Sequence, residues 1–293
     1  TAAARRGETL PPDHAFLDAL GDIAEIEALD AAFRAQVLQL PGEADIAREV
    51  GRDVDPDAIA AARNGVRLAL ANRIGDTLAD VHKRYAVARP FSPDSTAAGR
   101  RALANTTLDL MAGNRDPAAI ERVVHRFEAA DNMTDRLAAL SILSAAALPQ
   151  RIPALAAFHD RYRGDALVLD KWLALEATVP ALETLDRVRS LLGDPDFSLS
   201  NPNRIRALVG AFASANQTQF NRADGAGYEF LASFVADLDG RNPQVAARLL
   251  ISFRSWRALE SGRRARAEQA LKQIAAVPEL SPDTRDIITR TLA

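Results

Sequence analysis

The amino-acid sequence of 293 residues predicts an all-α protein. Three observations lead to this fold class. Apolar residues recur at helical spacing in nearly every long segment, and several expected helix starts carry a capping side chain directly before proline. No segment alternates polar and apolar residues with the enrichment in β-branched side chains that is typical of strands, so we expect essentially no sheet.

The helical period is clear from Asp55 onward. Apolar residues from Ile59 to Tyr85 follow the i, i+3/i+4, i+7 spacing that places them on one buried face. The same spacing recurs in four later segments, residues 120–127, 137–148, 205–212 and 230–238. Each segment is expected to form a helix with one face in the core.

Residue types at the ends of these segments indicate where helices start and stop. A capping side chain accepts a hydrogen bond from a free N–H of the first turn, and proline has no N–H to leave unpaired. Five dipeptides of this kind predict helix starts: Asp55-Pro56, Asp116-Pro117, Asn201-Pro202, Asn242-Pro243 and Ser281-Pro282. Glycines between the periodic runs predict helix ends. They are Gly99, Gly113, Gly164, Gly193 and Gly240.

About thirteen to fifteen helices with short connections fit into the chain, and such helices stack antiparallel against their neighbours. The expected architecture is an irregular α-solenoid, a superhelical array of antiparallel helix hairpins of the HEAT/armadillo type. No fixed-period repeat is present in the sequence, so the array is expected to be diverged. Residues 1–293 are expected to form a single domain, with a weak seam near residues 89–95, where Arg89-Pro90-Phe91-Ser92-Pro93 interrupts the pattern.

Composition excludes several classes of function. A net charge of -3 and an aromatic content of 5% argue against a nucleic-acid-binding surface. No cysteine is present, which leaves no thiolate metal site and makes a cytoplasmic setting the default expectation. The longest apolar stretch, residues 137–149, is too short to span a bilayer, and residues 1–12 lack the apolar core of a signal peptide. The start at Thr1 rather than Met suggests a fragment or a processed product.

A search for catalytic motifs finds none. The four histidines lie outside any H-E-x-x-H motif, and His125 with Glu128 lacks the second histidine of a zinc site. No nucleophile elbow, P-loop or dinucleotide-binding motif is present. Carboxylate pairs such as Asp194 and Asp196 are interpreted as solvated surface. The chain is therefore expected to contain no catalytic residue and to bind no metal or cofactor.

Residues 200–249 contain the candidate binding side chains. Gln244 and Arg248 are one helical turn apart and share a face, and Arg206 lies on a stripe with small residues that would let another surface approach. Arginine presents a planar set of donors suited to carboxylates and backbone carbonyls. Spacing alone favours the alternative that these arginines are ordinary surface or ion-paired residues. The intervening Asp224-Gly225-Ala226-Gly227 is interpreted as a tight turn between helices.

Several motifs of this chain together point to a known family. The strongest motifs are Asn201-Pro-Asn-Arg-Ile-Arg206, Asp224-Gly-Ala-Gly-Tyr228 and Arg241-Asn-Pro-Gln-Val-Ala-Ala-Arg-Leu249. Supporting motifs are Asn132-Met-Thr-Asp135, Leu137-Ala-Ala-Leu-Ser141, Asp170-Lys-Trp172 and, more weakly, Leu40-Pro-Gly-Glu43 and Asp55-Pro56. With these motifs the chain closely resembles the C-terminal helical domain of bacterial aminopeptidase N, the alanyl aminopeptidase family of gluzincin zinc metallopeptidases. The resemblance extends over essentially the whole chain and is most specific from Asn132 onward.

This resemblance implies a four-domain parent enzyme that releases N-terminal amino acids from peptides. Its β domains and its catalytic domain, which holds the zinc and the exopeptidase motif, have no counterpart here, so the isolated chain is expected to be inactive. The helical domain of the family is bowl-shaped, caps the active site and forms the peptide-access chamber. Residues matching Arg206, Gln244 and Arg248 are implied to line that chamber. The implied partners are peptide substrates and the catalytic domain of a monomeric parent, with no nucleic acid and no membrane.

An alternative function remains open from the sequence. A free-standing helical-repeat scaffold that binds a protein partner on its concave face would show the same helical pattern and the same lack of catalytic motifs. Continuation of the reading frame upstream into an H-E-x-x-H motif would favour the peptidase domain. An initiator methionine just before Thr1 would favour the scaffold.

Overall fold

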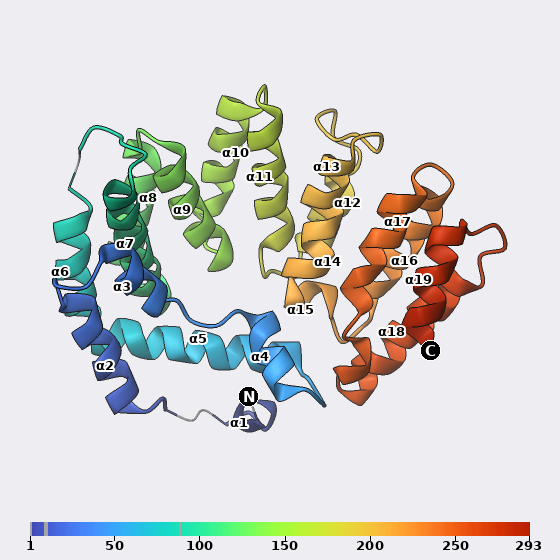
Figure 1. Ribbon diagram of the computed structural model, residues 1–293, viewed down its shortest axis with the longest axis horizontal. Helices are drawn as coiled ribbons and strands as arrows, with labels where there is room; N and C mark the ends of the chain where they lie inside the picture. The colour runs from blue at the N-terminus through green and yellow to red at the C-terminus, as the bar shows by residue number, and fades with distance from the viewer. Residues whose placement is uncertain (1, 9–10, 88) are drawn as a thin grey trace. The chain divides into compact units, whose positions relative to one another are not determined.

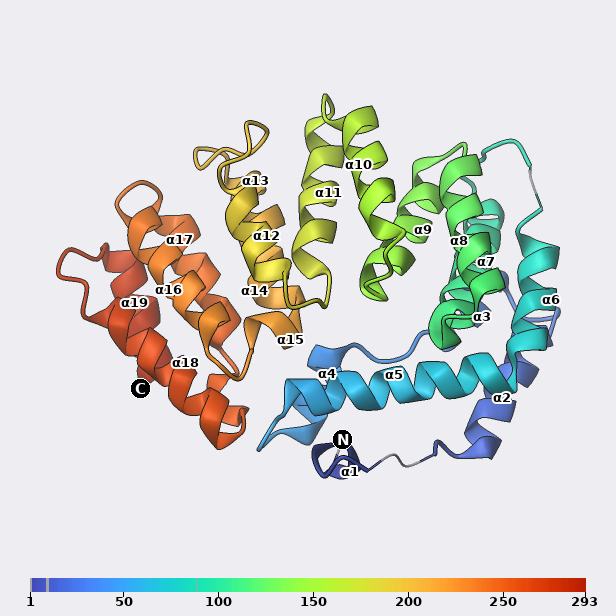
Figure 2. The ribbon, with the colours of Figure 1, turned by 180° about the vertical axis from the view of Figure 1, so that it is seen from behind.

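The computed structural model describes residues 2–8, 11–87 and 89–293 (Figures 1 and 2). Within these ranges the regular elements are all helices, and β-type pairing is limited to one isolated bridge between Val54 and Leu259. The prediction of an all-α fold with essentially no sheet is confirmed. The chain packs into two compact units, which we call unit 1 (residues 1–43 and 58–154) and unit 2 (residues 44–57 and 155–293).

Unit 1 contains the helices of the first half of the chain. They are α1 (Ala2–Arg5), α2 (His14–Glu25), α3 (Ala31–Val37), most of α5 (Pro56–Arg73), α6 (Gly75–Tyr85), α7 (Ser95–Met111), the 3-10 turn η1 (Ala112–Asn114), α8 (Pro117–Ala129) and α9 (Met133–Ala145). Helix α7 packs against α3 and α6, and α8 packs against α9 (Figure 1). The core between α2 and α7 is made of fully buried side chains such as Leu17, Leu38, Leu70, Leu78 and Leu103.

The periodic run from Ile59 to Tyr85 forms two helices, α5 and α6. The break falls at Ile74, whose backbone leaves the helical region with φ -118° and ψ 19°. The side chain of Ile74 nevertheless stays buried between those of Leu70 and Leu78. One apolar face therefore continues across the break, as the spacing predicts.

The predicted helix end at Gly99 is wrong, because α7 runs through this residue from Ser95 to Met111. Gly99 lies at a close contact between α7 and α3. A Cβ atom placed there would lie 3.0 Å from the backbone nitrogen of Ala32 and 3.3 Å from its Cβ. The glycine is a packing residue inside a helix, and a one-residue signal cannot distinguish this use of glycine from a helix end.

Unit 2 contains the remaining helices. They are α4 (Glu43–Val50, apart from its first residue), most of α10 (Arg151–Tyr162), α11 (Ala166–Thr178), α12 (Thr184–Leu191), α13 (Pro202–Ile205), the π-helical turn η2 (Arg206–Gly210), α14 (Ala211–Ala215), α15 (Gln217–Phe220), α16 (Ala226–Asp239), α17 (Pro243–Leu249), the 3-10 turns η3 (Leu250–Phe253) and η4 (Trp256–Ala258), α18 (Ser261–Ala275) and α19 (Pro282–Leu292). Successive helices lie side by side: α11 with α12, α16 with α17, and α18 with α19 (Figures 1 and 2).

Aromatic rings fill the core between α14 and η3. The ring of Phe220 stands edge-on to those of Phe212 and Tyr228, at centroid distances of 6.3 and 5.2 Å. The hydroxyl of Tyr228 donates to Oδ1 of Asn221 at 2.9 Å, which satisfies the one polar group of the cluster. Burial raises the pKa of this hydroxyl, because the charged phenolate would lose its hydration.

Residues 44–57 are distant in sequence from the rest of unit 2 and are joined to it by backbone and charged contacts. The amide of Val54 donates to the carbonyl of Ala258 at 2.8 Å, and the amide of Glu260 donates to the carbonyl of Val54 at 2.9 Å. The buried guanidinium of Arg263 forms ion pairs with Asp55, Asp57 and Glu260. The start of α5 is thereby held against the start of α18.

The local signals for helix starts are confirmed at all five dipeptides. Each capping side chain accepts a hydrogen bond from a backbone N–H of the first turn. The donor–acceptor distance is 2.9 Å for Asp116 and Asn201, 3.0 Å for Asp55, and 3.2 Å for Asn242 and Ser281. Four of the five predicted ends also hold: Gly164, Gly193 and Gly240 lie one or two residues after the last residue of a helix, and Gly113 lies in the 3-10 turn η1 that follows α7.

The helices of the described residues are more numerous than predicted, because residues 202–220 divide into short pieces, α13, η2, α14 and α15, instead of one helix. The stretch near residues 89–95 links α6 to α7 inside unit 1, and the two units divide near Glu43, Asp57 and Ala154. The weak seam near residues 89–95 stays a prediction. That residues 1–293 act as a single domain remains our prediction.

Candidate functional site

Arg206 is placed by a π-helical turn in unit 2. The amide of Ala211 donates to the carbonyl of Arg206, five residues back, and this widened turn spans Arg206–Gly210. Asn201 caps the preceding α13 and fixes where the segment begins. The side chain of Arg206 is exposed, and its guanidinium donates to Oδ1 of Asn203, so both lie on the same face as predicted. Single π turns inside α-helices occur frequently at functional sites.

Gln244 and Arg248 are exposed on α17, one turn apart. Among the residues that the structure describes, neither side chain has a hydrogen bond or ion pair. Their neighbours Ala246, Ala247 and Leu249 are buried and attach α17 to the core of unit 2. The fold therefore uses the apolar side of α17 and leaves the two polar side chains available for another molecule.

The segments that carry these three side chains meet at Gly210. A Cβ atom at Gly210 would lie 3.7 Å from Cβ of Arg206 and 3.7 Å from Cδ2 of Leu249. The structure thus brings the π-helical turn of Arg206 next to the end of α17, where Arg248 lies. A Cβ atom at Gly210 would make only ordinary van der Waals contacts, so the approach of the two segments does not depend on glycine at this position.

Another arginine of the same motif has a structural role. Arg204 is buried and forms an ion pair with Asp170 of α11, and it also donates to the carbonyl of Ala166 at 2.9 Å. The motifs Asn201–Arg206 and Asp170–Trp172 therefore contact each other. Sequence reasoning missed this pair because 34 residues separate the two partners.

The turn at residues 224–227 is confirmed as a tight connection between helices. Gly225 has φ +82°, a conformation that favours glycine, and Asp224 accepts the amide of Ala226 at 3.0 Å. A Cβ atom at Gly227 would lie 2.2 Å from the carbonyl oxygen of Phe220, so only glycine fits there. The turn positions α16 and contributes no ligand-binding geometry.

A histidine–aspartate pair in unit 2 also escaped the sequence analysis. Nε2 of His159 lies 2.9 Å from Oδ2 of Asp196, and the imidazole ring lies 4.2 Å from the ring of Trp172. The interpretation of Asp196 as simple solvated surface is therefore wrong. No spacing signal could have revealed the pair, since its members come from α10 and from the link after α12.

The described residues contain neither a metal-binding cluster nor a helix that could span a membrane. Across residues 2–8, 11–87 and 89–293, no three histidine, cysteine, aspartate or glutamate side chains gather as a metal ion would require. The donor set of zinc is thus not provided by these residues. None of the described helices combines the length and the apolar character needed to cross a bilayer.

Comparison with known proteins assigns the chain to a family. The family described as "Domain of unknown function (DUF3458_C) ARM repeats" matches residues 1–293. The chain belongs to this ARM-repeat family. This membership agrees with the helical-repeat architecture predicted from the sequence and seen in the structure.

Relatives of this ARM-repeat chain are named as peptidases. It is 38% identical over 279 residues to Aminopeptidase N of Caulobacter vibrioides, covering 94% of this chain and 32% of that protein. It is 36% identical over 289 residues to Aminopeptidase N of Escherichia coli, covering 99% of this chain and 33% of that protein. The ARM-repeat chain therefore spans about a third of the length of the curated relatives it matches.

A solved structure supports the same relationship. Legionella pneumophila aminopeptidase A, crystallised in complex with aspartic acid, matches 99% of this chain with a TM-score of 0.89 and 25% sequence identity. The match uses 35% of that longer chain. The resemblance to the helical domain of aminopeptidase N is confirmed at the level of the family and of the fold.

Proposed function

We propose that this chain is the C-terminal domain of a zinc metallo-aminopeptidase, and that it caps the active site and forms the chamber through which peptides enter. One observation carries the proposal. The relatives named Aminopeptidase N match 94–99% of this chain, yet the chain accounts for only 32–33% of their length. A domain that matches as a whole, within proteins three times as long, has its catalytic partner elsewhere in the parent.

Arg206, Gln244 and Arg248 are proposed to line this chamber. Their exposure supports the role, since the two α17 side chains have no partner among the described residues and the guanidinium of Arg206 donates to the neighbouring Asn203. A guanidinium can donate two parallel hydrogen bonds to a carboxylate, or single bonds to peptide carbonyls. In a chamber that partly excludes water, one such bond would contribute about 1.5–3 kcal/mol to peptide binding.

The zinc, the general base and the group that captures the free amine of the substrate are proposed to lie in the catalytic domain of the parent. The described residues of this chain do not provide a zinc donor set, and we derive no chemical step from them. The isolated chain is accordingly proposed to be inactive. The parent is proposed to be a cytoplasmic monomer in peptide catabolism that acts on peptides and binds neither nucleic acid nor membrane.

The test compares this chain with the complete parent reading frame, each purified and assayed with an alanine arylamide. We expect the parent to release the arylamine and this chain to show no turnover above a metal-free control. Turnover by the isolated chain would contradict the proposal that the catalytic groups lie elsewhere in the parent. A reading frame that contains no H-E-x-x-H motif would instead favour a free-standing helical-repeat scaffold that binds a protein partner.

A further inference from the structure

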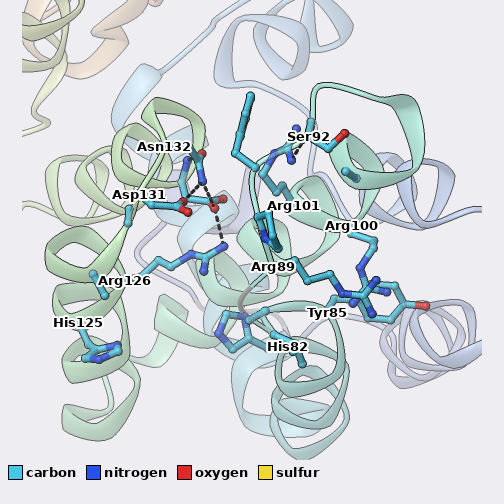
Figure 3. A pocket seen from close by; sticks show the side chains of 18 of the residues that line it. His82, Tyr85, Arg89, Ser92, Arg100, Arg101, His125, Arg126, Asp131 and Asn132 are labelled. Carbon is cyan, nitrogen blue, oxygen red and sulfur yellow. Dashed lines mark hydrogen bonds and ion pairs between the residues drawn. The ribbon is translucent and has the colours of Figure 1, made fainter.

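Unit 1 contains a cavity of about 960 Å³ between α6, α7, α8 and the start of α9 (Figure 3). Cavities that bind small molecules typically have about 300–1,000 Å³. The link between α6 and α7 forms one border, and the Asn132–Asp135 motif forms the opposite border. The candidate chamber residues of the proposed function all belong to unit 2, so this cavity needs an explanation of its own.

Arginine dominates the lining of the cavity. The arginines are Arg89, Arg100, Arg101, Arg122 and Arg126. Arg100 and Arg101 donate to backbone carbonyls, those of Arg84 at 3.1 Å and Ser92 at 2.8 Å, so their charges are not neutralised by these bonds. Over the described residues, Arg100, Arg101 and Arg122 form no ion pair with a carboxylate.

The carboxylates of the lining balance this charge only in part. They are Asp94, Glu121, Asp131 and Asp135. Asp94 accepts the amide of Ala97 at the start of α7, and Asp135 is buried in an ion pair with Arg126. His82 also lines the cavity. Its pKa is lowered first by burial and then by the positive charges of Arg126 and Arg122.

Two of the lining arginines have a buried N–H donor without an acceptor. The Nε–H groups of Arg101 and Arg126 are buried and find no acceptor among the described residues. Buried donors of this kind are rare in folded proteins, because an unmade hydrogen bond costs about 1–3 kcal/mol. An oxyanion is the ligand class that a guanidinium binds best.

The position of Arg126 is fixed before any ligand arrives. Its Nη2 lies 2.9 Å from Oδ2 of Asp135. A dashed line marks an interaction of Arg126 in Figure 3. Asp135 in turn accepts hydrogen bonds from Asn105 at 2.9 Å and from Asn132 at 2.8 Å. This network holds the guanidinium in place, and preorganisation lowers the entropic cost of binding.

The border formed by the α6–α7 link includes exposed apolar side chains beside its polar ones. Phe91 is 55% exposed although it is a large apolar residue, and Arg101 lies over its ring at 4.8 Å from the centroid. Val87 on the same link is also exposed. An apolar surface next to an arginine cluster matches a ligand that has an apolar body and one anionic end.

We propose that this cavity is a binding site for a small organic molecule that carries a carboxylate or phosphate group, with the oxyanion held by the guanidinium groups of α7 and α8 and the apolar part against Phe91. Carboxylates and phosphates share the geometry that arginine recognises. The proposal concerns binding to this chain alone. The expected binding does not depend on whether the parent hydrolyses peptides.

Three probes with the same aromatic body test the proposal: phenylacetate, phenyl phosphate and the neutral phenylacetamide. Binding to the 293-residue chain is measured by titration calorimetry and by ligand-observed NMR at constant ionic strength. We expect at least one anion to bind saturably and about tenfold more tightly than phenylacetamide, because charge-assisted hydrogen bonds require the oxyanion. The tighter of the two anions identifies the source, a carboxylate or a phosphate.

Variants locate the site. Arg122→Gln removes an exposed positive charge at the cavity and should weaken binding of the anion about fivefold or more. Phe91→Ala should weaken binding of both aromatic anions and leave binding of inorganic phosphate unchanged. The matched control is Arg254→Gln, which removes an exposed arginine of unit 2 and should leave the affinity unchanged. Circular dichroism confirms that each variant is folded.

Three results would overturn the proposal. The first is that neither anion binds saturably. The second is that phenylacetamide binds as well as the anions. The third is that Arg122→Gln and Arg254→Gln weaken binding equally, which would mean that the anions follow the overall charge of the chain and not this cavity.

Discussion

At the scale of single residues, Arg263 connects two distant parts of the sequence. It is 6% exposed, donates from Nε to the carbonyl of Asn221 at 2.6 Å, and pairs with Asp55 and Asp57. Arg263→Ala should destabilise unit 2 by about 1–3 kcal/mol, because the carbonyl of buried Asn221 loses its donor and the ion pairs with the partly exposed carboxylates are lost. Arg254→Ala, at an exposed position, should cost less than about 0.5 kcal/mol.

Both variants can be measured in the same way. Trp172 and Trp256 are the two tryptophans of the sequence and both lie in unit 2, so tryptophan fluorescence in urea reports the unfolding of that unit. Similar midpoints for Arg263→Ala and the wild-type chain would show that these ion pairs contribute little.

Substitution of Arg248 distinguishes a role in peptide binding from a role in stability. Because its side chain has no described partner, Arg248→Ala should change the stability of the chain by less than about 0.5 kcal/mol. In the proposed parent, the same change should lower kcat/KM for peptides roughly 10-fold or more, since a charge-assisted hydrogen bond is lost. It should affect a short arylamide substrate much less.

The control is Arg241→Ala, which removes an exposed arginine from the turn just before α17. Peptide and arylamide kinetics are measured for both variants. An equal loss for peptides and arylamide in Arg248→Ala would place this residue outside the peptide-binding surface.

His82 predicts a pH dependence for unit 1. Its Nδ1 lies 2.9 Å from the carbonyl of Ala104, and burial, followed by Arg126 and Arg122, lowers its pKa. The unfolded chain therefore takes up a proton at a higher pH than the folded chain does. The stabilisation is fully present above the ordinary histidine pKa of about 6.5. It is lost as the pH falls through the pKa that His82 has in the folded chain.

The measurement is hydrogen exchange in α6 and α7 between pH 7.5 and 5.5, corrected for the intrinsic exchange rates. His82→Gln should reduce the loss of protection at the lower pH, whereas His14→Gln, at an exposed position, should leave it as in the wild type. An unchanged loss of protection in His82→Gln would show that other groups cause it.

At the scale of helices, two glycines inside helices predict opposite effects of the same substitution. Gly99 of α7 packs against Ala32 with a Cβ clearance of only 3.0 Å, whereas a Cβ at Gly65 of α5 would meet no atom within 4 Å. Gly65→Ala should stabilise unit 1 by up to about 1 kcal/mol through helix propensity. Gly99→Ala should destabilise unit 1 despite the same gain, because the backbone of α3 would have to move.

Thermal unfolding followed by circular dichroism compares the two variants. If Gly99→Ala were as stabilising as Gly65→Ala, the α3–α7 contact would be able to adjust without cost, and glycine at position 99 would not be needed for the packing of α7 against α3.

These helices also show which features a sequence can reveal. Helix starts at Asn201 and Asn242 were predictable because the capping residue and its N–H are two or three positions apart. The Arg204–Asp170 and His159–Asp196 pairs were not, because tertiary packing brings their members together. For the candidate site, spacing placed Gln244 and Arg248 on one face, but only the family resemblance proposed a ligand. Only the structure shows that the end of α17 lies next to the π-helical turn that carries Arg206.

At the scale of the whole molecule, unit 2 is discontinuous in sequence, since residues 44–57 belong to it. A fragment of residues 155–293 would lack Asp55 and Asp57, the carboxylates that pair with Arg263. We expect this fragment to unfold at lower urea than unit 2 of the full chain. A synthetic peptide of residues 44–57, added in excess, should restore part of the difference, since a ligand that binds the folded state stabilises it.

Tryptophan fluorescence of the fragment measures both effects. The control peptide carries Asp55→Asn and Asp57→Asn and should restore less. Equal stability of the fragment and of unit 2 in the full chain would show that residues 44–57 only rest on a unit that is complete without them.

The pairing of Asp55 with Arg263, 208 positions later in the chain, also limits when unit 2 can fold during synthesis. At about 5–20 residues per second, a ribosome needs roughly 10–40 s to travel between these positions. During that interval the segment from Ala44 to Asp57 has been made, but the edge of α18 that receives it does not yet exist. Unit 1 can assemble early, whereas unit 2 closes only when nearly all of the chain has left the ribosome. Truncated translation products that stop before Arg263 would therefore expose this segment to proteases and chaperones.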